Sequence, residues 1–272
     1  MQELSVTQQR LINNYNKGTF QTISAEVVNE YPLTIHVNDE EFATIVCSPD
    51  NLSELIIGFL ASEGMIRSYP EVKALSIDKA KGIAYVDLHQ RSSIDPALFS
   101  KRRISSCCGK SRQSFYFQSD AMTTKPLHAD MLIHPVQCMR NMETLRRLSY
   151  VHRATGGVHN AALFSQENII VQFSDIGRHN AMDKIYGRCL QQHIETHHTI
   201  IAISGRISSE MVVKAVRIGS PILLSKSAPT GLALDLANEL GLTTVGFIRN
   251  GSFNVYTHPG RINDTLPFPV NP

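Results

Sequence analysis

Residues 199–225 read TIIAISGRISSEMVVKAVRIGSPILLS, and this stretch decides the fold class. The apolar runs Thr199–Ser204 and Pro221–Ser225 are short, bounded by turn residues and typical of buried strands. Between them, apolar residues recur with the spacing of one helix face: Met211, Val212, Ala215 and Val216. Because strand and helix alternate, the stretch predicts an α/β layer with a substantially parallel sheet.

The sequence on either side continues this alternation. Ala161–Phe164 and Ile169–Phe173 predict a hairpin, and the apolar side chains from Met182 to Cys189 predict a helix after it. Thr230 and Gly241 delimit a later helix. The remaining elements expected here are a helix that starts at Pro135 and strands at Thr243–Ile248 and Asn254–Thr257. We therefore predict a C-terminal α/β domain over residues 119–272.

The N-terminal half has a different organisation. Leu33–Val37 and Ala43–Val46 alternate in polarity around a turn, which predicts a hairpin. The other elements expected in this half are a helix from Ser48-Pro49 to Gly64 and strands at Ala74–Ile77 and Ile83–Leu88. Together they predict a smaller α+β domain over residues 21–118. Residues 1–20 are polar and rich in Gln and Asn, so we expect a flexible N-terminal arm there.

Composition restricts the class of protein. The chain has 272 residues, of which 42% are hydrophobic and 18% charged, and its net charge is +2. These values are typical of a soluble globular protein and favour neither nucleic acid nor a membrane as partner. The five cysteines lack the spacing of a disulfide framework, which favours a reducing compartment. Because residues 1–20 lack the apolar core of a signal peptide, we expect a cytoplasmic protein.

Two adjacent cysteines, Cys107 and Cys108, are the first candidates for chemistry. The surrounding residues 101–112 include five cations and no acid. A nearby positive charge stabilises a thiolate, which is the nucleophilic form of cysteine. Ser and Gly around the pair indicate an accessible loop, although two cysteines on a solvated basic surface without a function fit the same pattern. We interpret Cys47, Cys138 and Cys189, which lie in apolar patterns, as packing residues.

A second group of candidates follows the predicted strands. Ligands of open α/β sheets bind outside the carboxyl ends of the strands, and helix N-termini there favour anions. The alternative is that each loop is only a solvated connection. No GxGxxG or Walker motif is present, which disfavours a dinucleotide fold or a P-loop. The cations that we expect to converge on a phosphate-bearing ligand are Arg178, His179, Lys184, Arg206, Lys226 and Arg249, with Asp175 or Asp183 for a base or a ribose hydroxyl.

Metal chemistry is not expected. His193 and His197 have i,i+4 spacing but lack the HExxH pattern of a zinc protease. His128-Ala129-Asp130 resembles the start of a zinc deaminase motif, but the glutamate and the later PCxxC are missing. We therefore predict neither a catalytic nor a structural metal.

Several segments resemble one known family, the formate dehydrogenase accessory sulfurtransferases of the FdhD/NarQ family. The resemblance covers about residues 21–265. It rests on Ile57-Gly58-Phe59-Leu60, Gly156–Ala162, Asp175–Lys184, Ser204–Ser208, Ser225–Thr230 and Asn254–Pro259.

The resemblance implies a function and a set of partners. Members of this family accept persulfide sulfur from a cysteine desulfurase and pass it to a molybdenum cofactor that carries two pterin guanine dinucleotides. That cofactor, here a bound substrate, then enters formate dehydrogenase. The resemblance also implies a deaminase-like, three-layer α/β fold for the C-terminal domain and a homodimer. The alternatives are a cofactor-binding chaperone without sulfur transfer, a nucleotide-processing deaminase-like enzyme and a redox sensor that closes a disulfide between Cys107 and Cys108.

The resemblance also assigns roles to individual residues. Cys107 and Cys108 fall where the family has a sulfur-carrying CxxC, but the two intervening residues are missing, so either cysteine is a candidate carrier. The segment that matches the family's cofactor-binding stretch comprises Phe247, Ile248, Arg249, Asn250, Gly251 and Ser252. The positions expected near the guanine nucleotide are Arg178, His179, Asp183, Lys184, Gly205, Arg206, Ser208 and Lys226.

Overall fold

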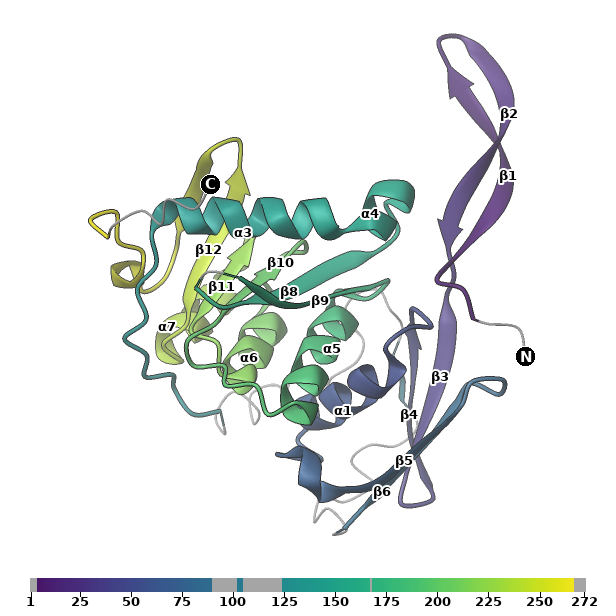
Figure 1. Ribbon diagram of the computed structural model, residues 1–272, viewed down its shortest axis with the longest axis horizontal. Helices are drawn as coiled ribbons and strands as arrows, with labels where there is room; N and C mark the ends of the chain where they lie inside the picture. Colours follow the sequence, from purple (N-terminus) through teal and green to yellow (C-terminus); the bar gives the residue numbers. More distant parts are fainter. Residues whose placement is uncertain (1–3, 90–101, 105–123, 167, 267–272) are drawn as a thin grey trace.

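A computed structural model of the chain describes residues 4–89, 102–104, 124–166 and 168–266. Its larger sheet has six strands in the order β13-β12-β11-β10-β8-β9 (Figure 1). The three neighbours β10, β11 and β12 are parallel, as predicted, whereas β8, β9 and β13 each run antiparallel to their neighbours. The strands are β8 (His159–Phe164), β9 (Ile169–Asp175), β10 (Ile200–Ile203), β11 (Ile222–Ser225), β12 (Thr243–Arg249) and β13 (Ser252–Val255).

Helices cover both faces of this sheet and give three layers (Figure 1). Alternate residues of one strand supply the two cores, because successive side chains point to opposite faces. Ile201 and Ile203 pack with the helices on one face, and Ile200 and Ala202 pack with the helix on the other. This explains why the predicted strands are apolar throughout. The first face carries α5 (Arg178–Gln191), α6 (Ser209–Ile218) and α7 (Gly231–Glu239), and the second carries α3 (Pro135–Leu148).

The smaller sheet has five strands in the order β5-β6-β3-β4-β7, and α1 (Leu52–Ser62) packs on one of its faces. Its central hairpin has the predicted turn, with Asn38 and Asp39 both at positive φ. The last strand, which was not predicted, pairs parallel to β4 just before the adjacent cysteines. The strands are β3 (Tyr31–Val37), β4 (Glu40–Cys47), β5 (Val72–Asp78), β6 (Ile83–Leu88) and β7 (Arg102–Ile104).

Helices α1 and α5 join the two sheets through a very close crossing. A Cβ atom added to Gly58 would lie 1.7 Å from the carbonyl oxygen of Asp183, and one added to Gly187 would lie 1.9 Å from that of Glu54. Only glycine permits this approach, because the backbones themselves are in contact. We call this contact between α1 and α5 the seam. It includes the polar residues around the contact, which are Asp50, Ser62, Asp175, Asp183, Lys184 and Lys214.

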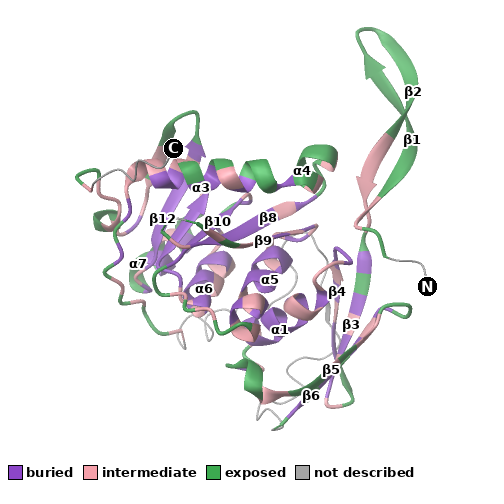
Figure 2. Ribbon diagram, in the orientation of Figure 1, coloured by how far each residue is buried: buried purple, intermediate pink, exposed green. Residues whose placement is uncertain are grey.

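Much of the segment expected to be a flexible N-terminal arm, residues 1–20, has regular structure. Strand β1 (Thr7–Asn16) pairs antiparallel with β2 (Thr19–Val28) in a hairpin that projects from the body and is largely exposed (Figures 1 and 2). Lys17 and Gly18 both have positive φ, as a two-residue hairpin turn requires. The polar composition hid the alternation of Leu11, Asn13 and Tyr15 along one face of the hairpin.

The short helix α4 (Tyr150–Thr155) was not predicted, and single 3-10 turns occur at Tyr69–Glu71 and Pro259–Arg261. The predicted domain boundary between residues 118 and 119 lies outside the described residues. Within the described part of the chain, no helix is both long enough and apolar enough to cross a membrane.

Candidate functional site

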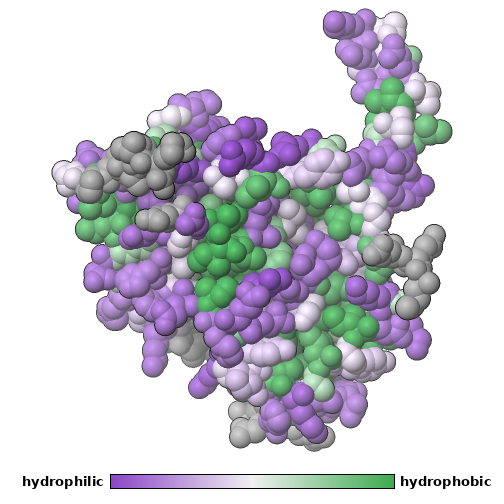
Figure 3. All heavy atoms as spheres, in the orientation of Figure 1, coloured by the Kyte–Doolittle hydropathy of each residue, from purple (hydrophilic) through white to green (hydrophobic). Residues whose placement is uncertain are grey.

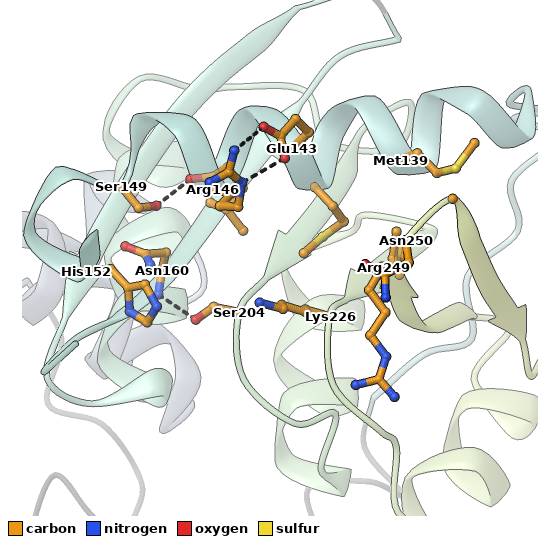
Figure 4. A pocket seen from close by; sticks show the side chains of 14 residues that line it. Met139, Glu143, Arg146, Ser149, His152, Asn160, Ser204, Lys226, Arg249 and Asn250 are labelled. Atoms are coloured by element: carbon orange, nitrogen blue, oxygen red, sulfur yellow. Dashed lines mark hydrogen bonds and ion pairs between the residues drawn. The ribbon is translucent and has the colours of Figure 1, made fainter. Parts of the chain in front are cut away.

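The carboxyl ends of four strands meet at one edge of the larger sheet. Strands β10, β11 and β12 are parallel, and β9 shares their direction because both β9 and β10 are antiparallel to β8. A cavity of about 380 Å³ opens at this edge, between the strand ends and the helices α3 and α4 (Figure 4). We call it the strand-end pocket. Its position is the one at which open α/β sheets bind ligands.

The strand side of the pocket contains five of the predicted site residues. They are Lys226, which follows β11, and Ile248, Arg249, Asn250 and Gly251, which end β12 and turn into β13. Figure 4 shows the Lys226 side chain extending along the floor toward Ser204. Asn160 and Ser204 complete this side.

The turn from β12 to β13 has an unusual backbone. Asn250 and Gly251 have φ values of 52° and 76°, which is the hairpin turn that Asn-Gly favours. The pairing register shifts between Gly246 and Arg249, and Phe247 has a φ of 54°, which is uncommon for an aromatic residue. The Arg249 guanidinium lies 5.3 Å from the centre of the Phe247 ring, a cation–π contact. The backbone geometry and this contact together position the Arg249 charge.

Reciprocal hydrogen bonds fix the floor. The Asn160 amide donates to Ser204 Oγ at 3.0 Å, and the Ser204 amide donates to the Asn160 carbonyl oxygen at 3.0 Å. Ser174 Oγ donates to Asn160 Oδ1 at 2.6 Å. These bonds tie β8, β9 and β10 together, so the polar groups of the floor are preorganised.

The helix side was missed by the sequence analysis. Met139 and Met142 of α3 line the pocket from this side. Asn160 and Ser204 lie in segments that resemble the family, but neither residue was predicted as a site residue. The lining residues from α3, α4 and the residue between them are Met139, Met142, Glu143, Leu145, Arg146, Ser149 and His152.

The charges around the pocket favour an anion. Glu143 accepts hydrogen bonds from Arg146 Nε at 2.8 Å and from its Nη2 at 2.5 Å, and these bonds lower the pKa of the Glu143 carboxyl. The negative charge of Glu143 thus neutralises the positive charge of Arg146. Lys226 and Arg249 form no ion pair with any described residue, so their charges are available to a ligand.

Two histidines stand beside the floor. His152 Nδ1 lies 2.8 Å from the Val158 carbonyl oxygen, which only accepts, so Nδ1 is the donor of this hydrogen bond. Burial lowers the pKa of His159, and the positive charge of Arg178 lowers it further. A neutral His159 is therefore favoured.

The predicted site residues Asp183 and Lys184 lie in the seam and do not line the pocket. Lys184 Nζ lies 2.9 Å from a carboxylate oxygen of Asp175 and 2.9 Å from one of Asp50. Burial lowers the pKa of Lys184, but these two carboxylates raise it above its ordinary value. Asp183 accepts a hydrogen bond from Ser62 Oγ at 2.6 Å and pairs with Lys214. Both side chains are fully enclosed by protein partners.

Asp175 is also a seam residue. Its carboxylate accepts hydrogen bonds from the Ser48 amide at 3.1 Å, the Gly177 amide at 2.9 Å and Asn180 Nδ2 at 2.9 Å. These contacts bind the end of β9 to the residue after β4. The buried carboxylate therefore connects the two sheets and is not available to a base or a ribose.

The other predicted residues lie at the strand-end edge but not among the residues that line the pocket. A Cβ on Gly205 would meet Arg178 Cδ at 3.4 Å and His159 Nδ1 at 3.4 Å, so the glycine makes room for these side chains. His179 Nε2 lies 3.2 Å from the Glu210 carboxylate. The residues of this group are Arg178, His179, Gly205, Arg206 and Ser208, and Phe247 and Ser252 also do not line the pocket.

The candidate sulfur carriers Cys107 and Cys108 lie outside the described residues. The three described cysteines, Cys47, Cys138 and Cys189, are buried. Burial raises the pKa of Cys138 and of Cys189 to about 12, and it also raises that of Cys47. Their thiols are therefore protonated and shielded. Within the described residues, no three His, Cys, Asp or Glu side chains are grouped so that they could hold a metal ion.

Comparison with known proteins places this geometry in a family. The model of the FdhD/NarQ family matches residues 28–263. A protein of Bacillus pumilus named sulfur carrier protein FdhD is 52% identical over 260 residues, which are 96% of this chain and 99% of that protein. A protein of Staphylococcus aureus with the same name is 50% identical over 93% of this chain and 96% of its own length. The crystal structure of a putative formate dehydrogenase accessory protein from Desulfotalea psychrophila has a TM-score of 0.76 and 26% identity, and covers 96% of this chain and 100% of that one. The mixed α/β arrangement is thus shared with a solved structure.

Proposed function

The chain belongs to the FdhD/NarQ family, and from this premise we propose that it is a sulfur carrier. In this proposal it takes persulfide sulfur from a cysteine desulfurase and passes it to the molybdenum bis(pterin guanine dinucleotide) cofactor that formate dehydrogenase needs. The observation that carries the proposal is the 52% identity, over 96% of the chain, to a protein named as a sulfur carrier. The proposal includes a cytoplasmic homodimer and a deaminase-like C-terminal domain, residues 119–272, that binds the cofactor.

The strand-end pocket supports binding of a guanine nucleotide end of the cofactor. Its volume of about 380 Å³ lies in the range of small-molecule sites. Lys226 and Arg249 supply positive charge for the phosphates. The apolar side chains Met139, Met142 and Leu145 offer a surface on which a base can pack.

The sulfur chemistry needs a thiolate, and the described cysteines are poor sources of one because burial raises their pKa values. We assign the step to Cys107 or Cys108. The thiolate attacks the outer sulfur of the desulfurase persulfide, a new S–S bond forms, the donor S–S bond breaks and the desulfurase cysteine leaves as a thiolate.

The pairing of β7 supports a role for these cysteines near the strand-end edge. Ile104 is the partner of Ile45 in β4, and the residue after β4, Ser48, is hydrogen-bonded to the end of β9. Cys107 follows Ile104 by three residues, so covalent geometry limits the distance between their Cα atoms to about 11 Å. The chain thus enters the cysteine segment on the side of the smaller sheet that meets the larger one.

Mass spectrometry after incubation with a cysteine desulfurase and cysteine tests the sulfur step. We expect one added sulfur atom on the peptide with Cys107 and Cys108, and none on Cys138. The Cys107→Ala, Cys108→Ala double variant should lose the added sulfur, whereas the control Cys138→Ala should keep it. Failure to load the wild type would refute the proposal. A double variant that still supports formate dehydrogenase activity would favour the chaperone function instead.

A further inference from the structure

The β1–β2 hairpin presents one face that has the properties of an interface. Partner residues of an antiparallel pair lie on the same face, so the pairs Leu11–Ser24, Asn13–Thr22 and Tyr15–Phe20 share it. We call this the Leu11 face. Leu11, Tyr15 and Phe20 are 79%, 63% and 74% exposed, and the rings of Tyr15 and Phe20 lie 5.0 Å apart. In Figure 3 the projecting hairpin is largely hydrophilic in colour, with a small group of hydrophobic side chains between its tip and the body.

Several polar groups of the Leu11 face are paired with each other. Thr22 Oγ1 donates to Asn13 Oδ1 at 3.0 Å, Ser24 Oγ donates to Gln9 Oε1 at 2.9 Å, and Thr7 Oγ1 donates to Glu26 Oε1 at 2.6 Å. Polar groups that are paired with each other cost less free energy to bury than groups that must give up water. These three hydrogen bonds therefore lower the cost of burying the Leu11 face.

The opposite face differs in this respect. Its pairs are Arg10–Ala25, Ile12–Ile23 and Asn14–Gln21. The side chains of Arg10, Asn14 and Gln21 form no hydrogen bond with any described residue, and Ile12 and Ile23 are only 37% and 39% exposed. Covering this face would remove water from the Arg10 charge and would bury less exposed apolar surface than covering the Leu11 face. The contrast assigns the contact to the Leu11 face.

From these observations we propose that the Leu11 face of each hairpin packs on the body of a second copy of this chain, so that two hairpins are exchanged about a two-fold axis. This inference rests on the homodimer included in the proposed function and names the surface that forms it. A two-stranded hairpin alone is only marginally stable in water, which gives the hairpin itself a need for such a contact.

The area favours a second copy over another kind of partner. The three side chains together expose on the order of 400 Å². One partner that covers the hairpin once would bury about 800 Å² in total, which is the scale of weak contacts. A two-fold exchange repeats the contact and buries about 1,600 Å², the size of a standard stable interface.

The distribution of charge also favours a second copy of this chain as the partner. Of residues 7–28, only Arg10, Lys17 and Glu26 are charged. Glu26 is held within the molecule by Thr7 and by Tyr150, whose hydroxyl lies 3.3 Å from it. An apolar face with few charges lacks the complementarity that would select a charged partner, and is typical of contacts between identical subunits.

The mass in solution tests the inference, by light scattering after size exclusion or by sedimentation over a range of concentrations. The test variant is Leu11→Thr, Tyr15→Thr, Phe20→Thr, since threonine retains strand propensity. The matched control on the opposite face is Ile12→Thr, Ile23→Thr. We expect the wild type and the control to have twice the chain mass of 30.3 kDa. The test variant should dissociate with a constant raised about 100-fold or more.

The possible results distinguish the proposed interface on the Leu11 face from the homodimer on which it rests. A wild type that remains monomeric at all concentrations would refute both the homodimer and its proposed surface. A test variant that stays as dimeric as the wild type would refute only the surface. Circular dichroism and sulfur loading of the test variant should match the wild type, because its substitutions lie on the projecting hairpin and not in the body.

Discussion

The strand-end pocket and the seam use the same kinds of residue for opposite purposes. Lys226 lies in the pocket, where no described acid pairs with it, whereas Lys184 is buried between Asp175 and Asp50. Both lysines follow strands of one sheet, and both were expected to meet one ligand. The difference is one of position: Lys226 is in the loop after its strand, whereas Lys184 lies inside α5, on the side that contacts α1. A charge near a strand end indicates a ligand only when no second helix covers it.

The seam should be the most sensitive part of the molecule. We expect Gly58→Ala to lower the free energy of unfolding by more than about 3 kcal/mol, because its Cβ would collide with the Asp183 carbonyl. The control is Gly231→Ala in α7, where no atom lies within 4 Å of the added Cβ and the change should stay within about 1 kcal/mol. Urea denaturation measures both. Equal effects of the two substitutions would contradict the close crossing.

The two lysines provide a direct test of the comparison. Lys184→Met leaves Asp175 buried without its cation, and we expect a loss of about 3–5 kcal/mol in the free energy of unfolding. Lys226→Met, in the exposed loop, should change it by less than about 0.5 kcal/mol. Denaturant titration of the two variants beside the wild type decides. If Lys226→Met were the more destabilising change, the assignment of roles would be reversed.

Ligand binding should show the reverse order. We expect Lys226→Met to weaken binding of guanosine diphosphate about 10- to 100-fold, since a charge-assisted contact to phosphate is lost. The exposed Lys81, which pairs with Asp78 in the smaller sheet, is a matched control, and Lys81→Met should bind as the wild type does. Calorimetric titration measures both. Unchanged affinity in Lys226→Met would remove the pocket as the nucleotide site.

The smallest expected effect concerns pH. Burial and Arg178 depress the pKa of His159, while His152 nearby acts in the same direction and Asp175 opposes it. A depressed histidine pKa contributes stability above the unfolded value of 6.5, and this contribution is lost as the pH falls below it. His159→Gln should therefore flatten the decline of stability below pH 6.5. The exposed His197→Gln is the control, and an identical slope in both variants would argue against this environment.

The sequence predicted local elements well and their spatial relations less well. Short apolar runs such as Ile200–Ile203 identified buried strands, and Asn38-Asp39 identified a turn, because these signals are local. The polar residues of β1 hid its alternation. The carboxyl-edge rule correctly placed Lys226 and Arg249 at one edge of the sheet, because parallel strands share that edge. The helix side of the pocket, formed by α3 and α4, could not be predicted in this way. Glu143, Arg146 and His152 reach the pocket through a helix packed across the sheet, and no local spacing encodes that placement.

The backbone contact of Gly58 with α5 has a consequence for protein engineering. Chimeras that join the first half of one relative to the second half of another will retain their architecture only if helices α1 and α5 are transplanted as a matched set. A donor with a larger side chain at either glycine forces the two helical axes apart, and the two sheets then no longer share a fixed frame. Recombination breakpoints should therefore be sought outside this pair of helices.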